Sequence, residues 1–320
     1  MQILVTGGAG FIGSHLSTTL ISKNYNVILF DNLSTGTLKN ISHLSGLVSI
    51  VNGDIRDKPL VESLIEGSDI IIHLAAAVGV NNILQNPVEA ISVNYLGSQI
   101  ILDHAAKMKK RIIIASTSEI YGKNPAQPLL ETDDRVLGAP QKFRWTYSDA
   151  KSLEESHAHF LFITQGLKVT TLRLFNTVGP RQTGRYGMVL PRFIDSALRN
   201  EPIVIYGDGK QSRTFCHVDD VVEAFSLVIK NNSTIGEVFN IGGNEEITIT
   251  ELANKVKFIT KSKSEINYVP YSKAFKEGYE DILRRVPSTK KINKFTSWNA
   301  KKNIDTIILD MIHNLGIETS

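Results

Sequence analysis

Tyr147 and Lys151 are the pair of residues whose types and spacing point most directly to chemistry. Residues four apart lie on one face of a helix, and residues 152–155 are compatible with helix. A tyrosine with its usual pKa near ~10 is a poor base at neutral pH, but an ammonium and a cationic ring beside it favour the phenolate. Lowering that pKa by ~3 units takes ~4 kcal/mol. The pair indicates either a tyrosine base or a surface pair without function, and the rest of the chain must decide.

The first residues predict a site for a dinucleotide. A short apolar run, Gln2–Thr6, is followed by glycines at positions 7, 10 and 13 and then by a helical sequence. Glycines at this spacing allow a tight turn and let a pyrophosphate approach the N-terminus of the helix. Asp31, which ends the next strand pattern at 26–30, is placed to accept hydrogen bonds from an adenosine ribose and to repel a 2′-phosphate. These features favour NAD over NADP, although Asp31 could instead cap the next turn.

Strand and helix patterns alternate through the first 176 residues, which is typical of a parallel, doubly wound sheet of the Rossmann type. Further strands are expected at 48–51, 69–74, 111–115 and 168–175, and helices at 59–66, 87–108 and 147–165. Ligands of such sheets bind at the carboxyl ends of the strands. One cleft should therefore be lined by the residues that follow the strands, which are Gly7, Asp31, Ala75, Thr117 and Asn176.

The sequence becomes richer in turns after Asn176. It predicts a helix at 189–199, a strand at 203–206, a helix at 218–230, a strand at 237–241 and two smaller helices after residue 248. We expect an α/β protein with two domains. Residues 1–176 form the Rossmann domain, residues 177–320 form a smaller α/β substrate-binding domain, and segments near 213–242 return to the main sheet.

Composition excludes several classes of protein. The chain has 320 residues, 42% of them hydrophobic, and a net charge of +3. Its basic stretches, 107–111 and 290–294, are short and lack aromatic residues, so no nucleic-acid partner is expected. Cys216 is the only cysteine, which excludes intramolecular disulfides and cysteine-based zinc sites, and no His, Asp and Glu cluster has metal-ligand spacing. With no secretory signal and no apolar run of ~18 residues, we expect a cytoplasmic protein without a membrane span.

Four motifs follow one another along the chain: residues 6–13, residues 31–36, Tyr147 with Lys151, and residues 173–176. Together they resemble the extended short-chain dehydrogenase/reductases, and within them the NAD-dependent nucleotide-sugar epimerases, dehydratases and decarboxylases. The resemblance covers essentially the whole chain, and the glycine spacing is the usual form of that family.

The resemblance implies a mechanism. Tyr147 acts as base on the sugar 4-hydroxyl while a hydride passes from C4 to NAD, Lys151 binds the nicotinamide ribose and lowers the tyrosine pKa, and Thr117 hydrogen-bonds the same hydroxyl. The other cofactor-binding residues that the resemblance implies are Gly7, Gly10, Phe11, Ile12, Gly13, Asp31, Asn32, Asp54, Ile55, Leu74, Ala75, Ala76, Asn94 and Ser116.

Ser118 and Glu119 separate the branches of the family. The epimerases usually have small residues at both positions, whereas the 4,6-dehydratases have an Asp-Glu pair whose Asp protonates the leaving 6-hydroxyl. Serine is a far weaker acid, so dehydration lacks its proton donor here. Thr-Ser-Glu matches the UDP-glucuronate decarboxylases, in which the oxidised β-keto acid loses carbon dioxide without an acid for a leaving group. Glu119 could also be a structural carboxylate satisfied by backbone amides.

Other parts of the resemblance concern the substrate. The residues that it implies for substrate binding are Asn176, Val189, Tyr206, Arg213, Arg284 and Arg285. Arg213 and one of the two arginines at 284 and 285 are expected at the diphosphate. Residues 136–145 and the loop after Ala77 depart from the decarboxylase pattern. His73 is expected to be structural, and His157 and His159 to face outward.

The leading hypothesis is an NAD-dependent enzyme that oxidises a UDP-sugar at C4, as a UDP-glucuronate decarboxylase does; the alternative is a UDP-glucose or UDP-hexose 4-epimerase. A non-catalytic NAD sensor and a simple reductase with free NAD(P)H also compete. The sensor class predicts loss of the Tyr-Lys pair or of the phosphate arginine, and neither is lost. The resemblance further implies a homodimer through the helices that start near Pro87 and Tyr147.

Overall fold

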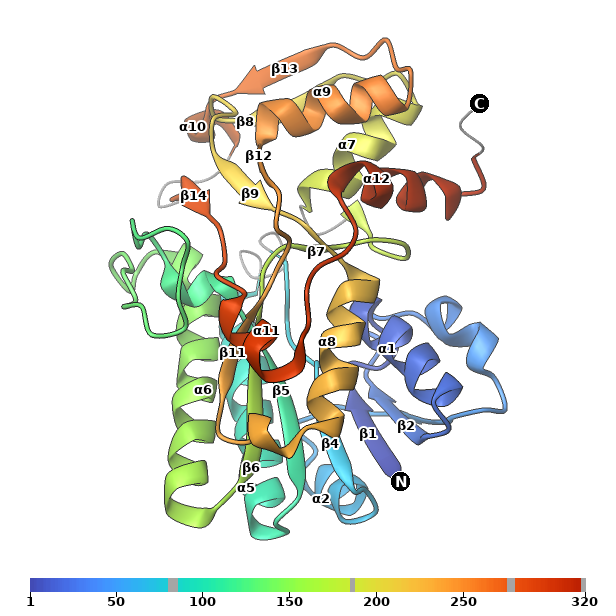
Figure 1. Ribbon diagram of the computed structural model, residues 1–320, viewed down its shortest axis with the longest axis vertical. Helices are drawn as coiled ribbons and strands as arrows, with labels where there is room; N and C mark the ends of the chain where they lie inside the picture. The colour runs from blue at the N-terminus through green and yellow to red at the C-terminus, as the bar shows by residue number, and fades with distance from the viewer. Residues whose placement is uncertain (80–85, 185–187, 275–279, 318–320) are drawn as a thin grey trace.

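A seven-stranded parallel sheet forms the centre of the protein in the computed structural model, which describes residues 1–79, 86–184, 188–274 and 280–317 (Figure 1). The strand order is β11-β6-β5-β4-β1-β2-β3, and every neighbouring pair is parallel. The strands are β1 (Gln2–Thr6), β2 (Asn26–Asp31), β3 (Ser49–Asn52), β4 (Ile70–His73), β5 (Arg111–Thr117), β6 (Lys168–Leu174) and β11 (Val238–Ile241). The predicted Rossmann-type fold is confirmed.

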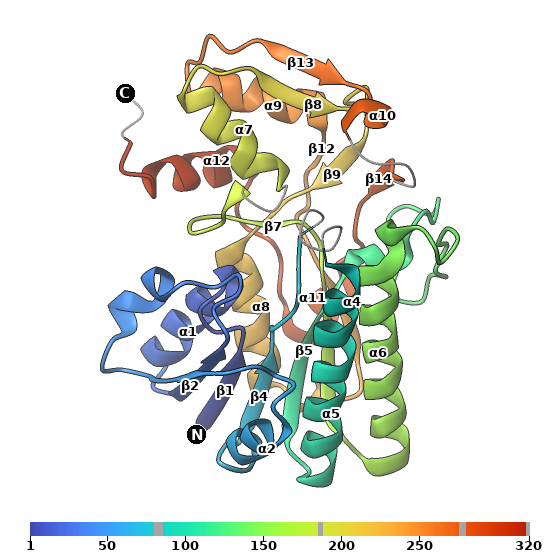
Figure 2. The same cartoon turned by 180° about the vertical axis from the view of Figure 1, so that it is seen from behind.

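Helices cover both faces of the sheet. On one face, α1 (Phe11–Ser22) and α8 (Val218–Lys230) pack together, and α11 (Lys290–Thr296) contacts β11. On the other face lie α2 (Lys58–Glu66), α5 (Ser98–Lys107) and α6 (Thr146–Gln165) (Figure 2). The strands are apolar on both sides because each face is buried under helices.

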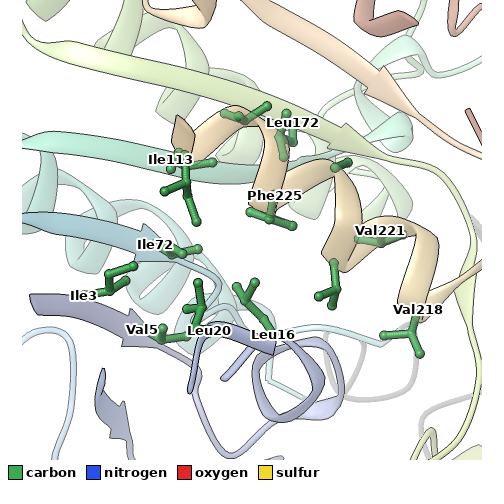
Figure 3. Packing of buried hydrophobic residues seen from close by; sticks show 14 of the residues in the cluster. Ile3, Val5, Leu16, Leu20, Ile72, Ile113, Leu172, Val218, Val221 and Phe225 are labelled. Carbon is green, nitrogen blue, oxygen red and sulfur yellow. The ribbon is translucent and has the colours of Figure 1, made fainter. Parts of the chain in front are cut away.

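The core under α1 and α8 joins parts of the chain that are more than 200 residues apart. Figure 3 shows side chains of both helices meeting the strands; the labelled residues are Ile3, Val5, Leu16, Leu20, Ile72, Ile113, Leu172, Val218, Val221 and Phe225. Because β11 pairs with β6 and α8 packs on α1, these two elements of the expected returning segment near 213–242 lie with the N-terminal layer, whereas β9 (Ser212–Thr214) pairs with β12 (Glu246–Thr248) and β14 (Arg284–Arg285).

The helix expected at 87–108 contains a π-helical segment. It consists of α4 (Pro87–Ile91), the π-helical turns Ser92–Gly97 and then α5. Wider turns of this kind are frequent at functional sites. Here they carry Asn94, a predicted cofactor residue, and no feature of the hydrophobic pattern distinguishes them from an α-helix.

The C-terminal region is built from short strands and helices around a second core. Its helices are α7 (Val189–Leu198), α9 (Ile249–Ile259), α10 (Tyr271–Ala274) and α12 (Ile304–His313). Its strands are β7 (Thr177–Val178), β8 (Ile203–Tyr206), β9 (Ser212–Thr214), β10 (Cys216–His217), β12 (Glu246–Thr248), β13 (Ile266–Val269) and β14 (Arg284–Arg285). With α11, the described residues after 248 form four α-helices rather than the expected two.

The strand expected at 203–206 is confirmed as β8. The strands β7, β9, β10, β12 and β14 were not predicted because two or three residues are too few to display an alternating pattern, and the four-residue β13 was not predicted either. Across the ranges that the structure describes, no helix combines the length and the apolar character that crossing a membrane requires.

Candidate active site

The glycine turn after β1 is held by backbone contacts. Gly7 has a φ of +71°, and its amide donates to the Phe30 carbonyl at 2.8 Å. A Cβ on Gly13 would lie 2.2 Å from the Gly7 carbonyl oxygen. At the start of α1, Gly10 offers no capping side chain and the first turn holds no acidic residue. The N–H groups of that turn, Phe11 and Ile12 included, therefore suit the pyrophosphate of a dinucleotide.

Asp31 lies at the carboxyl end of β2, beside this turn. Its Oδ2 accepts from the Ala9 amide at 2.9 Å and its Oδ1 from the Leu33 amide at 2.8 Å. Burial raises the pKa of Asp31, and these backbone amides oppose the rise. The carboxylate thus caps the loop, as the alternative interpretation had it, at the position expected for a ribose contact. Asn32 follows it and accepts from the Ser34 amide at 3.0 Å.

The loop after β4 passes close to the glycine turn, since a Cβ on Gly7 would lie 2.8 Å from the Ala75 amide nitrogen. The Asn94 side chain fixes this loop from the π-helical segment: its Oδ1 accepts from the Ala77 amide at 2.7 Å, and its Nδ2 donates to the Ala77 carbonyl at 3.0 Å. Leu74, Ala75 and Ala76 are thereby held half-buried at the same edge of the sheet. Residues 80–85 of this loop lie outside the described residues.

Asp54 and Ile55 lie at the same edge, after β3. Asp54 forms an ion pair with Arg56, with Oδ2 and Nη2 2.7 Å apart. Ile55 is buried, and a Cβ on Gly97 would meet its side chain at 2.4 Å. The Asp54 carboxylate is therefore engaged with Arg56.

Tyr147 and Lys151 occupy the first turns of α6, on one face, as their spacing predicted. Lys151 is 2% exposed, and its ammonium pairs with the Glu154 carboxylate. The pKa of Tyr147 is raised, first by burial and then by the carboxylates of Glu154 and Glu119. Burial and these two carboxylates thus oppose the phenolate, which differs from the expected lowering of the Tyr147 pKa.

Glu119 follows β5, in the short 3₁₀ helix Ser118–Tyr121. The Thr117 Oγ1 accepts from the Glu119 amide at 3.2 Å, and Ser148 Oγ in the first turn of α6 donates to the Glu119 carbonyl at 2.9 Å. These bonds hold the end of β5 against Tyr147's helix. Ser118 and Ser116 are buried beside them.

The Glu119 carboxylate lies between two guanidinium groups, those of Arg144 and Arg285. Burial would raise the pKa of Glu119, but Arg144 and Arg285 outweigh that effect and hold the pKa far below its usual range. The carboxylate is therefore ionised. The alternative interpretation, in which Glu119 is a structural carboxylate satisfied by backbone amides, does not fit, because the partners of its side chain are guanidinium groups.

Arg284 and Arg285 point to opposite sides of β14, as successive residues of a strand do. Arg285 is 9% exposed, and its Nη2 donates to Asn176 Oδ1 at 2.8 Å. Arg284 faces outward and pairs with Glu246 at 2.7 Å. β14 runs parallel to β9 with Arg285 opposite Arg213, so those two cations are neighbours and Arg284 stays apart from them.

Arg213 is buried and pairs with Asp281 at 3.0 Å. Burial is the main cause that lowers the pKa of Arg213, and nearby Arg285 adds to it. Tyr271 donates to the other oxygen of Asp281. Asn176 Nδ2 donates to the Thr214 carbonyl at 2.8 Å, which ties the end of β6 to β9. The predicted substrate residues Asn176, Arg213 and Arg285 therefore form one cluster with Glu119.

Val189 and Tyr206 lie in the C-terminal region. Val189 begins α7 and packs on the second core. Tyr206 ends β8, and the Arg192 guanidinium lies 4.4 Å from the centre of its ring.

Among the histidines, His73 is fully buried between the Thr6 and Ser98 hydroxyls, at 2.7 Å and 2.9 Å. His157 pairs with Asp103 of α5 at 2.8 Å. His159 is exposed on α6, with its ring against that of Phe160.

Sequence reasoning missed three functional contacts. It placed Arg144 in a divergent segment without a partner, it did not pair Asp281 with Arg213, and it passed over Glu154. Only the last had a local signal, because residue 154 lies on the same helix face as residues 147 and 151. No group of three metal-ligating side chains occurs within the described ranges.

Known proteins are similar to this chain over most of its length. A model of the NAD dependent epimerase/dehydratase family matches residues 3–242. A UDP-N-acetyl-alpha-D-glucosaminuronate decarboxylase of Bacillus cytotoxicus is 41% identical over 299 residues, 93% of this chain and 92% of that protein. A UDP-glucuronic acid decarboxylase of Danio rerio is 34% identical over 299 residues, 93% of this chain and 68% of that protein.

Two solved structures have the same fold over nearly their whole length. A UDP-glucose 4-epimerase of Thermotoga maritima, with UDP-glucose, has a TM-score of 0.89 and 32% identity, covering 99% of each chain. A UDP-glucuronic acid 4-epimerase of Bacillus cereus, with UDP-glucuronic acid and NAD, has a TM-score of 0.88 and 26% identity, again covering 99% of each chain. The chain therefore belongs to the NAD-dependent epimerase/dehydratase family, is an enzyme and uses NAD as its cofactor.

Proposed function

We propose that the protein is a UDP-uronate decarboxylase, which acts on UDP-glucuronate or on UDP-N-acetylglucosaminuronate. The observation that carries the proposal is the Glu119 carboxylate between Arg144 and Arg285, beside Ser118 rather than beside an acid. An ionised Glu119 cannot donate a proton to a leaving 6-hydroxyl, and a serine is too weak an acid to do so. Loss of carbon dioxide needs no such donor.

The charges around Glu119 suit a substrate with several negative groups. Three guanidiniums, those of Arg144, Arg213 and Arg285, outnumber the carboxylates of Glu119 and Asp281. Guanidinium groups bind phosphates and carboxylates in a planar, bidentate manner. A UDP-uronate offers both a diphosphate and a carboxylate, and it can replace Glu119 as the partner of these cations.

The residues have distinct tasks in the proposed reaction. Tyr147 takes the proton of the 4-hydroxyl, and Thr117 positions that hydroxyl. Bound NAD supplies the acceptor for the hydride from C4. The resulting 4-keto uronate is a β-keto acid, so the C5–C6 bond breaks, carbon dioxide leaves and the electron pair passes to the C4 oxygen as an enolate. C5 then takes up one proton from solvent water, the hydride would return to C4 from bound NADH, and Tyr147 returns its proton to the C4 oxygen.

Incubation with each of four substrates tests the proposal: UDP-glucuronate, UDP-N-acetylglucosaminuronate, UDP-glucose and UDP-galactose. The expected result is conversion of at least one uronate into the UDP-pentose, observed by NMR as loss of C6. If both uronates keep C6 while UDP-glucose and UDP-galactose interconvert, the decarboxylase proposal fails.

A UDP-hexose 4-epimerase is the second candidate. It is favoured by the fold similarity to the Thermotoga maritima epimerase, which carries UDP-glucose. This candidate shares the roles of Tyr147, Lys151 and Thr117 and assigns no chemical step to Glu119. The same four incubations separate it from the decarboxylase.

We further propose that two copies pair through α4 and α6, which lie side by side (Figure 2). Exposed apolar side chains occur on both helices and on the π-helical segment; they are Val88, Ile91, Leu96, Leu153, Phe160 and Ile163. Two such faces related by a two-fold axis form a four-helix interface. Light scattering should give twice the mass of one chain, and Phe160→Glu should halve it. A monomer in the unaltered protein contradicts the proposal.

A further inference from the structure

Glu154 is an ionisable residue that the proposed reaction does not use, although it touches the reaction's lysine. Its side chain is 0% exposed, and it pairs with the Lys151 ammonium three residues earlier on α6. Buried carboxylates are rare unless they are paired, because desolvation of the charge is costly. Tyr147, Lys151 and Glu154 occupy successive turns of one helix face, the face turned towards the sheet.

The groups around Glu154 come from three elements of the fold. On its own helix it faces Lys151, and Glu155 follows it. From β4, His73 Nε2 lies 4.0 Å from Glu154 Oε1, and from α5 the Ser98 hydroxyl faces the same carboxylate. Burial raises the pKa of Glu154, while Lys151 and Ser98 oppose the rise.

His73 does not balance the charge of Glu154. Burial and the Lys151 charge lower the pKa of His73 to about 3, so the imidazole is neutral at physiological pH. Its two nitrogens lie within hydrogen-bond distance of the Thr6 and Ser98 hydroxyls. Lys151 is thus the cation that faces Glu154.

We propose that Glu154 is a positioning residue that holds the Lys151 ammonium and balances its charge, and so sets the pH at which Tyr147 takes the substrate proton. Two features carry the inference: a wholly buried ion pair with the family's lysine, and its place on the Tyr147 face of α6. The inference agrees with the pKa of Tyr147, which the carboxylates of Glu154 and Glu119 raise. The inference depends on the proposed role of Tyr147.

Glu154→Gln tests the inference, because it removes the charge and keeps the size of the side chain. A negative charge two helical turns away, at an effective dielectric constant near ~20, shifts a pKa by about one unit. We therefore expect the pKa of Tyr147 to fall by about one unit in the NAD-bound protein. Ultraviolet titration of tyrosinate measures it once the curve of the matching Tyr147→Phe protein has been subtracted.

Glu155→Gln is the matched control. Glu155 is the neighbouring carboxylate of α6, pairs with Arg173 at 2.8 Å and is not among the groups that shift the pKa of Tyr147. It should leave the tyrosine titration unchanged. The acid limb of the pH profile for NAD reduction by added UDP-uronate should move to lower pH in Glu154→Gln and stay in place in Glu155→Gln.

An unchanged or raised Tyr147 pKa in Glu154→Gln overturns the inference. If Glu154→Gln does not fold, the double substitution Lys151→Met with Glu154→Met replaces the pair by apolar groups, which buried pairs often tolerate. If Glu154 offsets the charge of Lys151, this double substitution should raise the Tyr147 pKa by less than Lys151→Met alone does, and an equal or larger rise overturns the inference. The titration needs no substrate, so its failure is distinguishable from failure of the proposed reaction.

Discussion

The cofactor side and the sugar side of the active site are built in different ways. On the cofactor side, Gly7, Gly10 and Gly13 lie within one turn and Asp31 follows one helix later, and most of the contacts are made by the backbone. On the sugar side, the pairing of β14 with β9 brings Arg285 to Arg213 and Glu119, while Arg144 reaches Glu119 from the segment before α6 and Asp281 pairs with Arg213. Oxidation at C4 therefore depends on a local motif, whereas the later fate of the sugar depends on long-range contacts.

Tyr147→Phe should have the largest effect, because it removes the proposed base. We expect kcat to fall by about 10²- to 10⁴-fold while the protein keeps its NAD. Turnover assays, with the NAD content of the purified protein as control, measure this. Near-normal turnover would mean that another group takes the proton.

Arg285→Met and Arg284→Met form a matched pair on the sugar side. Arg285 pairs with Glu119 and Asn176, whereas Arg284 pairs with Glu246 at the surface. Truncating one partner of a buried charge pair costs about 2 kcal/mol or more, so kcat/KM should fall about 30-fold or more in Arg285→Met. Arg284→Met should change it less than about threefold. Equal losses of kcat/KM in the two variants would contradict the assignment of Arg285 to the site and of Arg284 to the surface.

Gly13→Ala tests the cofactor side. The new Cβ would lie 2.2 Å from the Gly7 carbonyl oxygen, and backbone cannot move aside cheaply. We expect a loss of about 1–3 kcal/mol in unfolding free energy and of bound NAD. Gly46→Ala is the control for adding a methyl group where there is space, since a Cβ at position 46 would meet no atom within 4 Å. The positive φ of Gly46, +76°, adds some backbone strain to this variant. Full NAD content in Gly13→Ala would contradict the proposed fit of this turn to a pyrophosphate.

The smallest expected effect is the pH dependence that Glu119 gives to the free energy of unfolding. Arg144 and Arg285 hold the pKa of Glu119 below its usual 4.5, so its ionised form stabilises the fold fully above that pH and loses the contribution as pH falls further. Urea unfolding should show Glu119→Gln to be less stable at neutral pH, with the difference shrinking in acid. Glu246→Gln, which breaks the surface pair with Arg284, should differ by less than about 1 kcal/mol at any pH. If the difference in unfolding free energy between Glu119→Gln and the unaltered protein does not shrink in acid, the account is contradicted.

The sequence was sufficient for the cofactor side because its signals are local. The glycine turn, Asp31 and the Tyr147 helix lie where their spacing placed them, and the family resemblance is confirmed. The ion pairs of Glu119 could not be predicted from the sequence, because they join residues separated by up to 166 positions. The choice between Arg284 and Arg285 also needed the structure, since it depends on the register of a two-residue strand.

The most direct measurement of the central claim follows the carboxyl carbon of the substrate. UDP-glucuronate and UDP-N-acetylglucosaminuronate, each labelled at C6, are incubated with the unaltered protein and with Tyr147→Phe. We predict that the unaltered protein releases labelled carbon dioxide from at least one of them, with an equal amount of UDP-pentose, and that Tyr147→Phe releases almost none. Retention of the label in both sugars by an active, NAD-containing protein would contradict the account.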